Sequence, residues 1–124
     1  MSGPRQRTDV EVQIFGTRRN ADARKALRFF AERRVKTHFV DLDERAASLG
    51  ELRRFAQRFG VPALVDRTSR RFVELGLGAA RLGDDAWLQK LADEPGLLVQ
   101  PLVRQQQRLT IGPAEAEWRA WIGR

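Results

Sequence analysis

The sequence predicts an α/β domain, because strand-like and helix-like hydrophobic patterns alternate along its 124 residues. A strand–helix–strand pattern at the start and a strand–strand–helix pattern at the end carry this prediction, and the region between them is helical in character. With 42% hydrophobic and 31% charged residues, the composition is that of a globular domain with a core that needs no disulfides.

The first unit begins with alternating apolar residues over 10–15, which indicates a strand. From Asn20 to about Arg34 the apolar residues recur every three or four positions, so we expect an amphipathic helix. Strand character returns over 38–42. Because such crossovers are right-handed, the two strands should lie parallel in one sheet.

The middle region predicts helices separated by turns. Ser48 followed by Glu51 is a capping-box pattern for a helix that extends to residue 59, and Gly60 is placed to end it in a left-handed conformation. The other predicted elements are a loop over 61–65, a short helix over 70–75 and a helix over 84–92.

The last part of the chain predicts a strand pair over 97–103 and 107–112, then a helix from 113 or 114 to 122. The complete order is a thioredoxin-like arrangement with a helical region inserted between its halves. We therefore expect one domain over residues 10–124 and a disordered lead over 1–9. Three tryptophans at helical spacing are expected to pack in or beside the core: Trp87, Trp118 and Trp121.

The net charge of +7 comes mainly from arginine. Solvated helix faces account for most of such an excess, while an acidic or nucleic-acid partner is the alternative. Arginine pairs alternate with Phe55, Phe59 and Phe72, but Phe55 and Phe59 share one helix face and should be buried, which argues against nucleic acid. No apolar run approaches the roughly 20 residues of a membrane helix, and without an export signal or cysteine a cytoplasmic location is expected.

His38 is the only histidine, and with no cysteine nearby it cannot form the usual zinc site. Asp41, Asp43 and Glu44 follow it as polar residues of a strand that enters a loop. We expect no metal.

Four segments resemble the arsenate reductase (ArsC) and Spx family. They are Val12 to Ala26, which is a strand, a loop and a basic helix, then Asp66 to Leu75, Glu94 to Val103 and Arg108 to Gly112. The resemblance covers roughly residues 10 to 123. It implies the thioredoxin-like fold and a cis peptide bond before Pro101, where a trans bond in an edge strand is the alternative.

The resemblance also implies where the family's chemistry would occur. A nucleophilic cysteine would stand at position 20, and three arginines would neutralise arsenate. Here position 20 is Asn20, which cannot form a thiolate. The arginine positions fall at or beside Arg67, at Gln100, and near Gly112 and Pro113, so only the first keeps its arginine.

The candidate site is therefore a vestigial anion or partner site made of Arg18, Arg19, Asn20, Arg67, Gln100 and Pro101. Asn20 has two interpretations: a helix N-cap, or an amide that still holds a small anion or an acidic side chain of a partner. Asp22 in the first turn argues mildly against a strong anion site.

These observations favour a non-catalytic, regulatory pseudoenzyme without a cofactor. Its resemblance to Spx-type regulators implies the RNA polymerase alpha subunit as a partner. The first alternative is a reductase or transferase that uses external glutathione, since thioredoxin-like folds can bind this tripeptide beside the cis proline. The second alternative is nucleic-acid binding through the arginine pairs.

Overall fold

The computed structural model describes residues 10–123. The predicted N-terminal lead over 1–9 lies outside the described residues, as does Arg124. The chain divides into two compact units. We call residues 10–41 with 100–123 the sheet unit, and Leu42–Val99 the helical unit.

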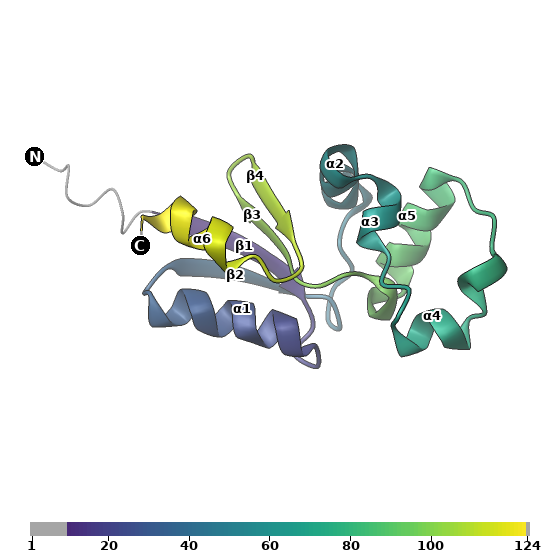
Figure 1. Cartoon of the computed structure of the whole chain (residues 1–124), viewed down its shortest axis with the longest axis horizontal. Helices are drawn as coiled ribbons and strands as arrows, with labels where there is room; N and C mark the ends of the chain where they lie inside the picture. Colours follow the sequence, from purple (N-terminus) through teal and green to yellow (C-terminus); the bar gives the residue numbers. More distant parts are fainter. Residues whose placement is uncertain (1–9, 124) are drawn as a thin grey trace, which may run out of the picture. The chain divides into compact units, whose positions relative to one another are not determined.

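The sheet unit contains a four-stranded mixed sheet with the strand order β2-β1-β3-β4 (Figure 1). Strands β1 and β2 are parallel, as the crossover rule predicts, and the other neighbours are antiparallel. Its elements in chain order are β1 (Glu11–Gly16), α1 (Ala21–Glu32), β2 (Lys36–Asp41), β3 (Leu102–Gln105), β4 (Arg108–Ile111) and α6 (Glu115–Ile122).

The core of the sheet unit lies between one face of the sheet and the helices α1 and α6. Trp118 of α6 is 2% exposed, and its ring centroid lies 5.4 Å from that of Phe29 and 5.3 Å from that of Phe30. Its indole N–H donates to Thr110 Oγ1 at 2.8 Å, which satisfies the buried polar atom. Trp118 is therefore a packing residue, as its helical spacing predicts.

The helical unit is built from short helices (Figure 1). Ser48 caps the first one by accepting from the backbone N–H of Glu51 at 3.1 Å, which confirms the predicted cap. Phe55 and Phe72 are buried, so these two aromatic rings are unavailable for stacking on bases. Phe59 was also expected to be buried, but it is only half-buried. Its elements are α2 (Leu49–Phe59), α3 (Val61–Leu64), α4 (Arg70–Glu74), η2 (Leu77–Ala79), α5 (Asp84–Asp93) and η3 (Pro95–Leu97).

Two predictions about the start of α3 are wrong. The expected loop after Gly60 is the one-turn helix α3, where Pro62 lies in the first turn and needs no intrahelical N–H partner. Gly60 has the expected positive φ of 85°, but its ψ of 145° lies outside the left-handed helical region. Gly60 is therefore both the C-cap of α2 and the N-cap of α3.

The predicted strand over 97–103 is also wrong in its first half. Leu97 belongs to the turn η3 and Leu98 forms only an isolated bridge with Val65, so β3 begins at Leu102. A run of apolar residues cannot distinguish a buried turn from a strand, because both bury the same side chains.

An ion pair joins α4 to the chain just before η3 within the helical unit. Arg71 donates to both carboxylate oxygens of Glu94, at 2.7 and 3.0 Å. These bonds lower the pKa of Glu94 below its ordinary value and raise that of Arg71.

Over residues 10–123 no helix is long and apolar enough to cross a bilayer, and no three His, Cys, Asp or Glu side chains cluster as metal ligands would.

Candidate functional site

The loop Gly16–Asn20 connects the end of β1 to the first turn of α1, and it contains three of the predicted site residues. Thr17 is buried, Asn20 is half-buried, and Arg18 and Arg19 are exposed. A helix N-terminus presents free backbone N–H groups and partial positive charge, so this loop is where an anion would bind if those donors were available.

Asn20 is the N-cap of α1. Its backbone is extended, with φ −83° and ψ 125°, and its Oδ1 accepts from the N–H of Ala23 at 2.9 Å. Its own N–H donates to the carbonyl of Thr17 at 3.1 Å. The capping interpretation of Asn20 is therefore confirmed: its side-chain oxygen holds a donor that an anion would otherwise use.

Gln100 closes the other side of the loop. Its Oε1 accepts from the backbone N–H of Thr17 at 2.7 Å, with the Thr17 hydroxyl 3.3 Å away. Gln100 is 6% exposed and Thr17 is 3% exposed, so these groups have little access to water. A neutral amide oxygen thus accepts the hydrogen bond of a buried backbone N–H in this loop.

Arginine side chains hold the loop from outside. Arg24 donates from Nη1 to the carbonyl oxygens of Arg18 and Arg19, at 2.9 and 3.0 Å. The guanidinium of Arg18 lies 4.8 Å from the centre of the Phe39 ring, and its Nε is 3.7 Å from a carboxylate oxygen of Asp41. The Arg18 side chain therefore points toward β2, a strand of the same unit.

Pro101 follows a cis peptide bond, as the resemblance implied. Its carbonyl accepts from the N–H of Gly112 at 2.8 Å. Gly16 faces Gln100 across the site: a Cβ there would lie 3.2 Å from Gln100 Oε1 and 2.9 Å from the Cβ of Ala23. A glycine is needed at position 16 because the Gln100 side chain and α1 approach the backbone so closely.

Arg67 belongs to the helical unit and the other five predicted site residues to the sheet unit. Within its unit, Arg67 is exposed and its guanidinium carbon lies 5.5 Å from the centre of the Phe72 ring. The site in the sheet unit is therefore defined by Arg18, Asn20, Gln100 and Pro101, together with Arg19 at the exposed side of the loop.

The sequence patterns did not identify Thr17 as a site residue. Its buried hydroxyl and N–H meet Gln100 from 83 positions away in the chain, and no local pattern encodes such a pairing. The resemblance places Gln100 before Pro101, and that is the signal that could have suggested a partner in the loop.

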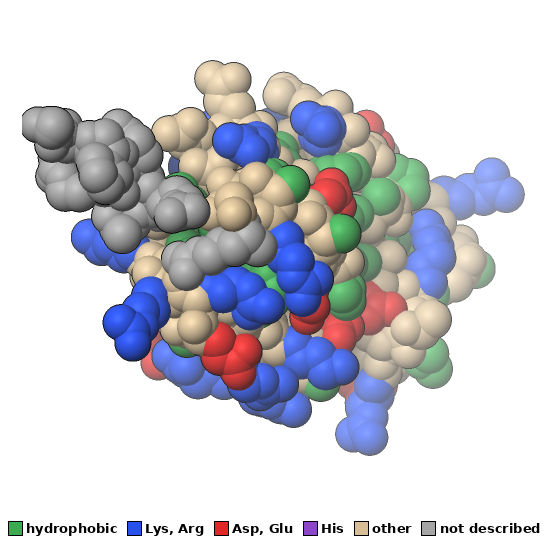
Figure 2. Space-filling model, turned by 60° about the vertical axis from the view of Figure 1, so that its left-hand side comes forward, with side chains coloured by type: hydrophobic (Ala, Val, Ile, Leu, Met, Phe, Trp, Pro, Cys, Tyr) green, Lys and Arg blue, Asp and Glu red, His purple; other side chains and the backbone are tan. Residues whose placement is uncertain are grey.

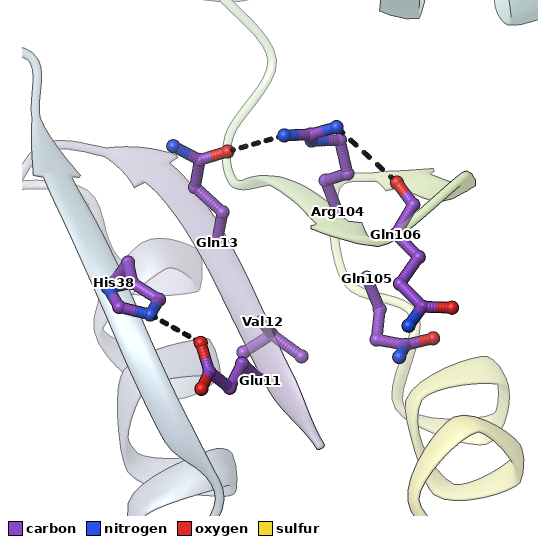
Figure 3. A pocket seen from close by; sticks show the side chains of 7 residues that line it. All are labelled: Glu11, Val12, Gln13, His38, Arg104, Gln105 and Gln106. Carbon is purple, nitrogen blue, oxygen red and sulfur yellow. Dashed lines mark hydrogen bonds and ion pairs between the residues drawn. The ribbon is translucent and has the colours of Figure 1, made fainter. Parts of the chain in front are cut away.

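A second polar pocket of about 400 Å³ lies where β1 and β3 separate (Figure 3). His38 points toward Glu11, with Nε2 2.9 Å from the carboxylate, and Arg104 lies between Gln13 and the carbonyl of Gln106. The hydrogen bond from His38 and the charge of nearby Lys36 lower the pKa of Glu11 below its ordinary value.

No hydroxyl or thiol lines this second pocket. It can hold a small polar molecule against charged and amide groups. The signal for it in the sequence is the polar alternation of Glu11 and Gln13 on one strand with Lys36 and His38 on the next.

The loop at the start of α1, the cis proline before β3 and the strand order together define a protein of the thioredoxin-like class. Residues 15–121 match the ArsC family. The chain belongs to this family.

Similar proteins match this chain over most of their own length. An arsenate reductase of Neisseria meningitidis serogroup A is 29% identical over 105 residues, which cover 82% of this chain and 90% of that protein. The structure of an arsenate reductase from Vibrio cholerae matches with 25% identity and a TM-score of 0.72, covering 82% of this chain and 89% of the other. The YFFB protein matches in fold, with a TM-score of 0.81 at 19% identity and coverage of 90% and 98%.

Proposed function

We propose that this chain is a non-catalytic member of the ArsC family that acts by binding another protein. The proposal rests on one observation, the residues and hydrogen bonds of the loop before α1. No cysteine is present in the sequence, and the oxygens of Asn20 and Gln100 accept hydrogen bonds from the backbone of their own loop and helix.

Reduction of arsenate to arsenite needs two electrons, which two thiols supply as they are oxidised to one disulfide. The first thiolate attacks the arsenic atom and an arsenate oxygen leaves as water; the second thiolate then attacks the arsenic-bound sulfur, which forms the disulfide and releases arsenite. Asn20 has no electron pair of comparable nucleophilicity, because the carboxamide nitrogen is delocalised into its carbonyl. Any turnover would have to draw both electrons from an external thiol such as glutathione.

The hydrogen bonds of the loop also oppose anion binding. An incoming oxyanion would have to displace Gln100 Oε1 from the Thr17 N–H, which it contacts at 2.7 Å, and so break a buried hydrogen bond. Asp22 in the first turn of α1 already complements the helix dipole and would repel the anion. These two effects support a loop that does not bind an oxyanion.

The kind of partner comes from the resemblance to Spx-type regulators. We therefore propose a regulatory contact with the RNA polymerase alpha subunit, in the cytoplasm and without a cofactor. The burial of Phe55 and Phe72 supports a protein partner over single-stranded nucleic acid, which needs accessible rings for stacking.

The experiment that tests this proposal has a binding arm and an activity arm. In the first, the purified C-terminal domain of the alpha subunit is titrated with the chain at low salt, and saturable binding is expected. Absence of binding at tens of micromolar would remove this partner. In the second, arsenate and glutathione are supplied, and only the uncatalysed rate is expected. Turnover above that rate would favour the glutathione-dependent alternative.

A further inference from the structure

The net positive charge of the described residues is concentrated in one unit. The described residues of the sheet unit carry eleven Lys and Arg against six Asp and Glu, whereas the helical unit carries nine of each. Within the sheet unit, seven of the eleven cations lie between positions 18 and 34, together with only two acids. The excess therefore belongs to α1 and its flanking residues and is not spread over the whole surface.

We define the α1 basic face as Arg24, Lys25, Arg28 and Arg33. The first three are exposed, and Arg33 is half-buried. Figure 2 shows Lys and Arg side chains gathered along the lower left of the molecule, in the region of α1 in Figure 1. Among the described residues, neither Lys25 nor Arg28 forms an ion pair with the protein itself.

Arg24 donates to two carbonyls of the loop before α1 and Arg33 donates to the carbonyl of Phe29, but the stability of the fold does not explain Lys25 and Arg28. Arg24 and Arg28 are four positions apart on one helix, and like charges at this spacing repel. Arg24 and Lys25 also lie in the N-terminal half of α1, where the helix dipole disfavours positive charge, and the last turn of α1 contains no basic residue. The face is thus arranged against the preference of an isolated helix, which indicates that it serves an interaction.

A groove of about 290 Å³ runs beside this face. Its aromatic residue, Phe29, is 4% exposed and is covered by cations: Arg33 lies 3.8 Å and Arg119 5.5 Å from the centre of the ring. Two carboxylates, Glu32 and Glu115, also line the groove. It therefore presents three cations and two anions around a buried aromatic ring.

We propose that the α1 basic face docks a carboxylate-rich protein segment, a site that deepens the proposed interaction function and rests on it. Aspartate and glutamate side chains of the partner pair with Lys25 and Arg28, and guanidinium groups bind carboxylates in a forked geometry. A basic residue of the partner fits against Glu32 and Glu115, which makes the pairing specific. Nucleic acid would find no exposed ring to stack on in this groove, because Phe29 is buried.

The test uses the full chain and fluorescein-labelled oligoglutamate, followed by fluorescence anisotropy at low and high salt. We expect saturable binding that weakens with salt. The double variant K25Q/R28Q should weaken it by about three- to tenfold, because two exposed ion pairs are lost. The matched control R54Q/R58Q removes the same charge from α2 and should leave the affinity unchanged.

Three results would overturn this inference: no binding of oligoglutamate, equal weakening by both double variants, or tighter binding of duplex DNA that K25Q/R28Q abolishes. The alpha-subunit domain is titrated with the same proteins. If the wild type and K25Q/R28Q bind that domain equally, the docking surface is wrong while the proposed function stands. If oligoglutamate binds as expected but the alpha-subunit domain does not, the polymerase partner is wrong while the basic face stands.

Discussion

Replacing Gln100 by methionine tests whether its amide oxygen closes the loop before α1. Methionine has a similar volume, so the change removes the acceptor without opening a large cavity. The Thr17 N–H, which donates to Gln100 Oε1 at 2.7 Å, would then be buried without this acceptor. The Thr17 hydroxyl can rotate to another acceptor, but the backbone N–H cannot.

The expected loss of stability follows from that one donor. A buried N–H left unsatisfied costs about 1–3 kcal/mol, so we expect the free energy of unfolding of Gln100→Met to fall by about 2 kcal/mol. Urea unfolding followed by circular dichroism measures this, and the slope of the transition should stay that of the wild type.

The control for this prediction is Gln107→Met, at an exposed position in the turn between β3 and β4. Its stability should remain within about 0.5 kcal/mol of the wild type, as for most surface substitutions. If Gln100→Met changes stability no more than Gln107→Met does, the contact between Gln100 and Thr17 contributes nothing to the fold and the reasoning is refuted.

Three further predictions concern the cap, the close approach and the ion pair. Asn20→Ala removes the acceptor for the Ala23 N–H and should cost about 1 kcal/mol in urea unfolding, whereas Asn20→Asp should cost far less. Gly16→Ala places a Cβ 2.9 Å from that of Ala23 and should lower the unfolding free energy by about 1–3 kcal/mol. Because Arg71 holds the pKa of Glu94 below 4.5, the stabilisation from this carboxylate is present above that pH and is lost as the pH falls. Glu94→Gln should therefore be less stable than the wild type at neutral pH and converge with it in acid, and a constant difference across the range would contradict this.

Local patterns predicted most of the elements because each has its own signal. The Ser48–Glu51 cap, the 3.6-residue period of α1 and the alternation in β1 depend only on neighbours in the sequence. The parallel pairing of β1 with β2 followed from handedness. The errors at Val61 and Leu97 came from apolar runs with no period of their own, where packing decides whether the residues form a loop, a helical turn or a strand.

The candidate site was predicted less completely, for a physical reason. The cap by Asn20 is local and could be predicted from residue type. The contact between Thr17 and Gln100 joins two distant segments and became visible only in the folded sheet unit. The sequence shows a basic helix after Asn20, but which of its cations contact the rest of the fold became visible only in the structure.

The most direct test of the account is to measure the steady-state rate at which the wild-type protein reduces arsenate with glutathione as the thiol. Metal-free wild-type protein should show only the background rate, because the chain supplies no sulfur nucleophile. A wild-type rate above background that is abolished by changing Gln100 or Arg67 would contradict the account.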